Sequence, residues 1–132
     1  SRELEAIIAS AALQVPSTYR IADYVVTAGG TIGAMASITL EKDGKRLTGV
    51  CAGDGPIDAA FLAIEQIIGH HYELDDFQIQ AVTEGREAMG SALVKLRADG
   101  RLYSGNGIST DVIGASIRAY ISALNKIVYE EA

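Results

Sequence analysis

The amino-acid sequence predicts an α+β fold in which two βββα units are related by a pseudo-twofold axis. When the sequence is shifted by 56 residues, residues 22–68 align with residues 78–124 without a gap. In each repeat, apolar and polar residues alternate along a central segment, which is the period of a half-buried antiparallel strand. Each repeat then ends in a segment with apolar residues at helical spacing. Two copies are too few for a solenoid, so we expect one domain with antiparallel sheets covered by helices.

A short helix is predicted before the first repeat. Over residues 2–13 the apolar residues fall on one face at helical spacing, and a proline then interrupts the pattern. A single amphipathic helix that leads into a compact domain is typical of a connection to an upstream domain. We therefore expect a linker helix over residues 1–16 and a compact domain over residues 17–132. The two repeats occupy about residues 19–70 and 75–129.

Each repeat is expected to contain three strands joined by short turns. In the first repeat the alternating segment places Ala34, Ala36, Ile38 and Leu40 on one face, and the second repeat alternates in the same way. Asp-Gly pairs follow both of these segments, at residues 43–44 and 99–100, and supply the positive φ angles that a tight hairpin requires. The strands are expected near residues 21–27, 34–41 and 46–52, and near residues 77–83, 92–97 and 102–107.

The two repeat helices differ in how much apolar surface they carry. The second helix is apolar over a wide arc between residues 112 and 127, which is more than one sheet face needs. We expect the additional surface to be buried against a second subunit, so the sequence predicts a homodimer. The first helix has a single stripe, formed by Ile57, Phe61, Ile64 and Ile68.

Composition excludes several classes of function. The 132 residues make one domain, and no apolar stretch approaches about 18 residues, so we expect no segment that spans a membrane. The net charge of −6 argues against nucleic-acid binding, which depends on neutralising phosphates. The single cysteine, Cys51, excludes an intramolecular disulfide and is typical of a reducing compartment, so we expect a cytoplasmic protein.

The two helix entrances differ in a way that points to a ligand. In Gly53-Asp54-Gly55-Pro56 the proline suits the first helical position, so Gly55 is the predicted N-cap, and it has no side chain to occupy the free N–H groups. In the second repeat the same position is Asp111, whose carboxylate can satisfy its own helix. An open helix N-terminus attracts a carboxylate or phosphate through its N–H groups and its dipole.

Asp58, in the first turn of the first helix, leaves two interpretations open. It could hold an ammonium group beside the anion, an arrangement that suits a free amino acid. It could instead fold back onto the backbone of the cap. In that case the Gly-x-Gly-Pro segment is only a tight strand-to-helix turn, and Asp58 is a favourable first-turn charge.

Other patterns in the sequence point to no chemistry. Gly105-Asn106-Gly107 looks like the start of a dinucleotide fingerprint, but its strands are linked by hairpins rather than by parallel βαβ connections. His70 and His71 point apart, and no cysteine or carboxylate cluster completes a metal site, so we expect a solvated helix C-terminus and no metal. No histidine lies near Cys51 in the sequence. We therefore expect no catalytic residues, and no enzymatic activity of this chain alone.

At the helix entrances the sequence resembles a known family. Residues 53–59 (Gly-Asp-Gly-Pro-Ile-Asp-Ala) are similar to the G-x-G-P-[VI]-D-A segment of the C-terminal regulatory domain of 2-isopropylmalate synthase. Residues 105–113 resemble its second-repeat G-x-G-x-x-T-D-[IV] segment, and residues 123–127 its closing helix. The resemblance covers about residues 15–129. It is less specific for the enzyme, because citramalate synthases end in the same module.

The resemblance implies an allosteric regulatory domain over residues 17–132. Enzymes of the family are acyltransferases that join acetyl-CoA to a 2-oxo acid, such as 2-oxoisovalerate, on a metal-dependent TIM barrel. Their C-terminal domain dimerises and binds leucine or isoleucine as a feedback inhibitor. Residues 1–16 would then lead from the catalytic barrel of the same polypeptide. The divalent metal and acetyl-CoA would belong to that barrel, with no cofactor in the present chain.

The resemblance also implies where the effector lies, between the first helix entrance and the first strands of the second repeat. The free N–H groups would take its carboxylate, Asp58 or Asp111 its ammonium group, and apolar side chains its branched side chain. Many relatives carry Asn at the position of Asp54, so the additional negative charge is expected to weaken binding. The implied site residues are Gly53, Asp54, Gly55, Ile57, Asp58, Leu74, Phe77, Ala81, Ala88, Gly90, Thr110 and Asp111.

The sequence is therefore compatible with two classes of function. The first is a homodimeric domain that binds leucine and inhibits a linked 2-isopropylmalate synthase, with an isoleucine-binding domain of a citramalate synthase as its alternative. The second is a domain that only dimerises and whose pocket is degenerate. A free-standing enzyme is disfavoured because catalytic groups are missing.

Overall fold

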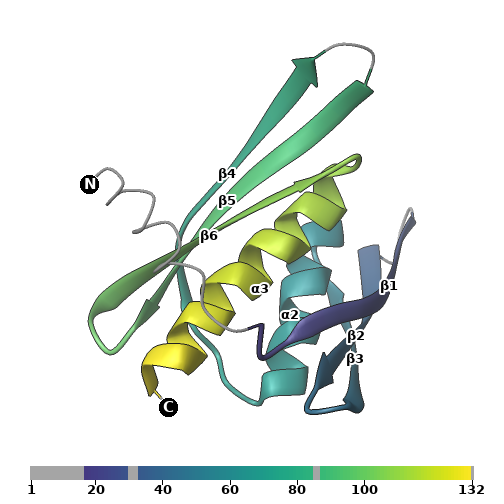
Figure 1. The fold of residues 1–132 in the computed structure, drawn as a ribbon. Coiled ribbons are helices and arrows are strands. Elements are labelled where there is room, and N and C mark those ends of the chain that lie inside the picture. Colours follow the sequence, from purple (N-terminus) through teal and green to yellow (C-terminus); the bar gives the residue numbers. More distant parts are fainter. Residues whose placement is uncertain (1–16, 30–32, 85–86, 132) are drawn as a thin grey trace, which may run out of the picture.

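The structure, a computed structural model, describes residues 17–29, 33–84 and 87–131. Within these ranges the chain forms six strands and two helices in the order βββαβββα (Figure 1). This confirms the predicted fold of two βββα units. The helix predicted over residues 2–13 lies outside the described residues.

The first unit is a three-stranded antiparallel sheet with a helix on one face. β1 (Arg20–Gly29) pairs with β2 (Gly33–Lys42), and β2 pairs with β3 (Lys45–Gly53). The turn between β2 and β3 has positive φ angles of 54° at Asp43 and 77° at Gly44, as predicted for a tight hairpin. The helix α2 (Pro56–Ile68) then packs across β2 and β3.

The second unit repeats this arrangement. Its sheet is formed by β4 (Glu73–Glu84), β5 (Glu87–Ala98) and β6 (Arg101–Ser109), in that order. The helix α3 (Val112–Glu131) crosses β5 and β6 and also contacts α2. Figure 1 shows α3 running diagonally over this sheet, with α2 beside it, so the two helices form the centre of the molecule.

The strand register corrects the gapless alignment of the two repeats. Tyr24 pairs with Ile38 in the first sheet and Phe77 pairs with Val94 in the second, so the first strands correspond with a shift of 53 residues. From β2 onward the shift is 56. The difference is three additional residues in the β4–β5 hairpin. The predicted superposition of the first strand on residues 77–83 with a shift of 56 is therefore wrong.

A shared β-bulge supports the corrected alignment. Both first strands shift register before an aspartate, which is Asp23 in β1 and Asp76 in β4. In each, the aspartate Oδ1 accepts the N–H of the next residue, at 2.8 Å from Tyr24 and at 2.9 Å from Phe77. The bulge turns Tyr24 and Phe77 to the face of the sheet that carries the core.

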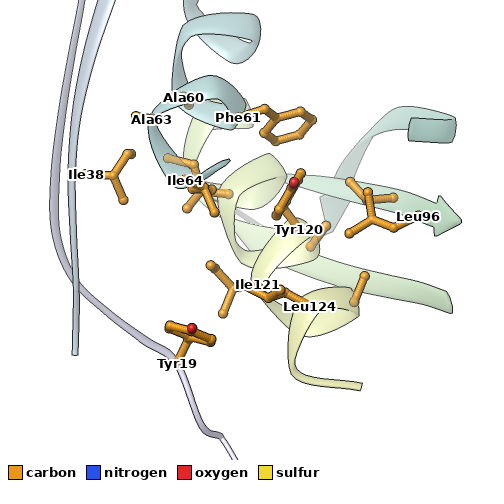
Figure 2. Close-up of a cluster of buried hydrophobic side chains, with 14 of the residues drawn as sticks. Tyr19, Ile38, Ala60, Phe61, Ala63, Ile64, Leu96, Tyr120, Ile121 and Leu124 are labelled. Atoms are coloured by element: carbon orange, nitrogen blue, oxygen red, sulfur yellow. The ribbon is translucent and has the colours of Figure 1, made fainter. Parts of the chain in front are cut away.

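The core lies between the helices and the inner faces of β2 and β5. Glycines on β3 and β6 allow the helices to approach closely, since a Cβ added to Gly105 would collide with the backbone of Ala119 and Ala123 in α3. Figure 2 shows Tyr120 of α3 beside Phe61 of α2, with ring centroids 4.8 Å apart. This contact joins the two units.

A buried asparagine links the start of the described chain to the last helix through two hydrogen bonds. Asn125 of α3 accepts the backbone N–H of Tyr19 at 2.9 Å and donates to the carbonyl oxygen of Tyr19 at 3.1 Å. Both residues are buried, at 6% and 8% exposure. The chain entering β1 is thus held against α3 as well as in its own sheet.

Candidate functional site

The entrance of α2 has the geometry that the sequence predicts. Gly55 is the N-cap, with extended backbone angles (φ −147°, ψ 175°) and no side-chain cap, and Pro56 occupies the first helical position. A Cβ added to Gly55 would meet no atom within 4 Å. The backbone N–H groups of the first turn therefore have no side-chain cap, and the position that a capping residue would occupy is open.

Asp58 folds back onto the preceding turn. Its Oδ2 accepts the backbone N–H of Asp54 at 3.0 Å, which is the second of the two interpretations left open by the sequence. Gly53 allows this arrangement, because a Cβ there would lie 2.7 Å from the same Oδ2 and 2.6 Å from the backbone nitrogen of Ala59. The carboxylate therefore lies at the helix entrance and is oriented by the main chain.

The entrance of α3 is capped by its own side chains. Asp111 Oδ1 accepts the N–H of Gly114 at 2.7 Å, which confirms Asp111 as the predicted N-cap. Its Oδ2 accepts a hydrogen bond from the hydroxyl of Tyr24, 3.1 Å away on β1 of the other unit. Partial burial raises the pKa of Tyr24, and the bond to Asp111 raises it further, while the charge of Arg118 opposes the rise.

The corrected register makes the two entrances directly comparable. Tyr24 corresponds to Phe77, and Asp111 corresponds to Gly55. Where the α3 entrance has the Tyr24 hydroxyl bonded to the Asp111 carboxylate, the two corresponding positions at the α2 entrance are Phe77 and Gly55, which carry neither group. Phe77 instead packs against Phe61, with ring centroids 5.6 Å apart and an interplanar angle of 78°. The two units thus differ in how their helix entrances are capped.

The other implied site residues lie on the second sheet. Leu74 and Phe77 are on the face of β4 that is turned toward the helices, and Leu74 is 42% exposed. Gly90 pairs with Ala81, and a Cβ on Gly90 would lie 3.4 Å from Val112. The side chains of Ala81 and Ala88 are outside the described part of the structure.

The structure thus divides the implied site into three parts. Gly53, Asp54, Gly55, Ile57 and Asp58 are together at the α2 entrance. A second part lies along β4 and the paired segment of β5. The third part, Thr110 and Asp111, belongs to the α3 entrance, where Asp111 bonds to β1 of its own chain.

Other predicted features can be placed as well. His70 and His71 are exposed after α2, as expected, and His71 Nδ1 lies 2.9 Å from Glu65 Oε2. Among the described residues there is no group of three or more His, Cys, Asp or Glu side chains that could hold a metal. Cys51 is a free thiol of intermediate burial. No helix in the described ranges combines the length and apolarity needed to cross a membrane.

Sequence reasoning missed two features that depend on contacts between the units. The Tyr24–Asp111 bond joins residues 87 positions apart, and the gapless alignment hid it by pairing Tyr24 with Gln80. A cavity of about 690 Å³ lies beside α3, and none of the implied site residues lines it. The signal that could have found the bond was the aspartate before each inward aromatic residue, at positions 23 and 76.

Comparison with known proteins assigns the family. A family model described as the LeuA allosteric (dimerisation) domain matches residues 1–128. The chain belongs to the LeuA allosteric (dimerisation) domain family. The chain is also similar to part of several named enzymes. It is 38% identical over 128 residues to a 2-isopropylmalate synthase from Clostridium kluyveri and 41% identical over 126 residues to one from Crocosphaera subtropica.

The match covers one portion of these relatives. It includes 97% of the chain and 25% of the Clostridium kluyveri enzyme, and 95% of the chain and 24% of the Crocosphaera subtropica enzyme. A 2-isopropylmalate synthase from Prochlorococcus marinus is 37% identical over 131 residues, with 98% of the chain and 24% of the enzyme covered. The chain thus spans about a quarter of the length of the curated relatives it matches.

Proposed function

We propose that this chain is the regulatory domain of a 2-isopropylmalate synthase and binds leucine as a feedback inhibitor. The observation that carries the proposal is the contrast between the two helix entrances. α3 is capped by Asp111, whereas α2 begins at Gly55 with no side-chain cap. Divergence of this kind within a repeated unit supports a ligand carboxylate at α2, in the role that Asp111 has at α3.

The residues around Gly55 have the groups that an α-amino acid needs. The N–H groups of Ile57 and Asp58 would donate to the ligand carboxylate, since Pro56 has none to offer. Asp58 is the better partner for the ammonium group, because among the described residues only its Oδ2 is bonded, to the N–H of Asp54, whereas both oxygens of Asp111 are bonded to Gly114 and Tyr24. The negative charge of Asp54 is expected to lower the affinity for the carboxylate.

We propose that the ligand side chain is held by apolar residues of β4. Phe77 lies against α2, and Leu74 and Ile79 remain 42% and 43% exposed on the face turned toward the helices. Within one chain, these residues and the α2 entrance enclose a ligand side chain on only part of its surface. A second subunit would complete it, which agrees with the dimerisation named in the family description.

The effector can be identified by thermal unfolding with leucine, isoleucine, valine and no ligand. A ligand at a hundredfold excess over its Kd adds about 2.7 kcal/mol, which raises the midpoint by roughly 10 °C in a domain of this size. A rise with leucine alone supports the proposal. A rise with isoleucine alone would assign the parent enzyme to the citramalate synthases instead.

The site itself is tested by Gly55→Asp. The new carboxylate would cap α2 as Asp111 caps α3, so stability without ligand should be equal or greater by a few tenths of a kcal/mol. Leucine binding should be abolished, because the N–H groups are occupied and the charge repels the ligand. The matched control is Gly55→Ala, which adds a Cβ into open space without a cap and should still bind. Wild-type affinity in Gly55→Asp would show that the carboxylate binds elsewhere.

A domain that only dimerises is the rival function. It is favoured by the outer face of the first sheet, where Val25, Met35 and Val50 are 56%, 44% and 47% exposed. A dimer in solution with no midpoint shift for any branched-chain amino acid would support this rival. The catalytic barrel, its divalent metal and acetyl-CoA remain proposals for the parent protein.

A further inference from the structure

A groove runs along α3 between the edges of the two sheets. It forms the cavity of about 690 Å³ described above, with α3 as its floor and with the entry to β1 and the strand β6 as its borders. Both strands are at the edges of their sheets within the described chain. Edge strands present backbone N–H and C=O groups that another extended chain can pair with.

The groove is positively charged although the protein is acidic. Arg20, Arg118 and Lys126 line it, and none of the lining residues is acidic, whereas the whole chain has a net charge of −6. None of the three takes part in an ion pair among the described residues. Lys126 donates only to the carbonyl oxygen of Ser104 on β6, at 2.6 Å. Arg118 also acts electrostatically on Tyr24, but none of the three cations has an acidic partner among the described residues that line the groove.

The spacing of these charges indicates an extended partner rather than a small ion. Arg118 and Lys126 are eight residues apart on α3, which places them about 12 Å apart along the helix axis. Residues i and i+4 of an extended chain are about 13 Å apart. Between the two cations lies Ser122, and the exposed Ile108 of β6 offers an apolar contact at 60% exposure.

We propose that this groove docks an extended acidic segment of a partner protein. Two carboxylates four residues apart would pair with Arg118 and Lys126, and Arg20 would add a third contact at the entry to β1. The main chain of the segment would run beside the sheet edges. This surface is separate from the α2 entrance, so the proposal does not depend on leucine binding.

The test uses a fluorescein-labelled peptide with the sequence Glu-Val-Glu-Val-Glu-Val-Glu and measures fluorescence anisotropy against the purified chain. The probe should bind saturably, and raising the salt from low to physiological concentration should weaken binding. Arg118→Gln and Lys126→Gln should each weaken it by about 2- to 5-fold. Lys45→Gln is the matched control, because Lys45 is exposed at the β2–β3 turn and does not line the groove.

Several results would overturn the proposal. One is the absence of saturable binding up to about 1 mM peptide. Another is equal affinity for the neutral peptide in which every Glu is replaced by Gln. A third is a loss of affinity in Lys45→Gln as large as in Arg118→Gln, which would indicate attraction to the protein as a whole rather than docking in the groove. Circular dichroism of each variant separates these outcomes from unfolding.

Discussion

Asn125 holds the backbone of Tyr19 with both halves of its side-chain amide. Replacing it with alanine would leave a buried N–H and a buried carbonyl without their partner. We expect Asn125→Ala to lower the free energy of unfolding by about 1–3 kcal/mol. Urea unfolding of this variant measures the loss, and an unchanged midpoint would show that water replaces the amide without cost.

Asn125→Asp tests the same contact through pH. One carboxylate oxygen can still accept the N–H of Tyr19, but the other would face the carbonyl oxygen and repel it. Burial and this repulsion should raise the pKa of the introduced carboxyl group in the folded state above the usual value of about 3.9. The folded state is then favoured below that value, and stability is lost as pH rises through the folded-state pKa. Urea unfolding at a series of pH values should therefore show the variant approaching the wild type near pH 4 and less stable at pH 7.

At the residue scale, the sequence predicts the features that depend only on neighbouring residues in the chain. The cap residues Gly55 and Asp111 were predictable because a proline and an aspartate at a helix start act on the adjacent backbone. The partner of Asp111 was not predictable in the same way, because Tyr24 reaches it from the other unit. Finding that contact requires the strand register, which the local sequence does not contain.

Among the elements, the closest packing is between β6 and α3. A Cβ on Gly105 would overlap the backbone of α3, so Gly105→Ala should force the helix away from the sheet. We expect it to reduce the free energy of unfolding by about 1–3 kcal/mol. Gly55→Ala is the control, since its Cβ meets nothing within 4 Å, and its smaller loss should reflect only that alanine is a poorer N-cap than glycine. Chemical denaturation of both variants makes the comparison, and equal losses would contradict the packing argument.

The elements themselves were largely predictable. Alternation and Asp-Gly turns predict the second and third strands of each unit, because a hairpin needs positive φ at the turn. The first strand of the second unit was misaligned because Thr27 and Gly29 match Thr83 and Gly85 by chance. Register is set by pairing with the central strand, and the longer β4–β5 hairpin shifts it by three residues.

At the scale of the whole molecule, Tyr120 lies where the two units meet. Its hydroxyl is buried and has no hydrogen-bond partner among the described residues. Burial raises its pKa strongly, and the negative charge of Glu65 adds to the rise. Within the described ranges the hydroxyl makes no hydrogen bond of ordinary geometry and interacts only weakly with Glu65, so Tyr120→Phe should change the free energy of unfolding at pH 7 by no more than about 1 kcal/mol.

The Tyr120 hydroxyl should also make the free energy of unfolding of the domain decrease at alkaline pH. A tyrosine whose pKa is raised by folding contributes stability below pH 10, and this contribution is lost as pH rises through the folded-state pKa. The wild type should therefore lose more stability between pH 7 and pH 11 than Tyr120→Phe does. Tyr129→Phe is the control, because Tyr129 is 54% exposed and should leave the alkaline loss unchanged. Identical losses in all three proteins would exclude Tyr120 as the cause.

The groove over α3 could not be predicted from the sequence. Its lining residues come from the entry to β1, from β6 and from α3, so no short segment contains the pattern. From the sequence alone, Arg118 and Lys126 are predicted only to be exposed charged residues on a helix. They line a groove only because the two sheets flank that helix, and this arrangement exists only when both units are folded together.

The bond between Tyr19 and Asn125 also affects how the protein is made. The two residues are 106 positions apart, so the contact cannot form until the ribosome has released nearly the whole domain. At about 5–20 residues per second, Asn125 is synthesised about 5–20 s after Tyr19. During that interval the first unit has only its own small core, and its exposed edge is available to other chains. Slow translation of the second repeat should therefore favour aggregation of the nascent protein.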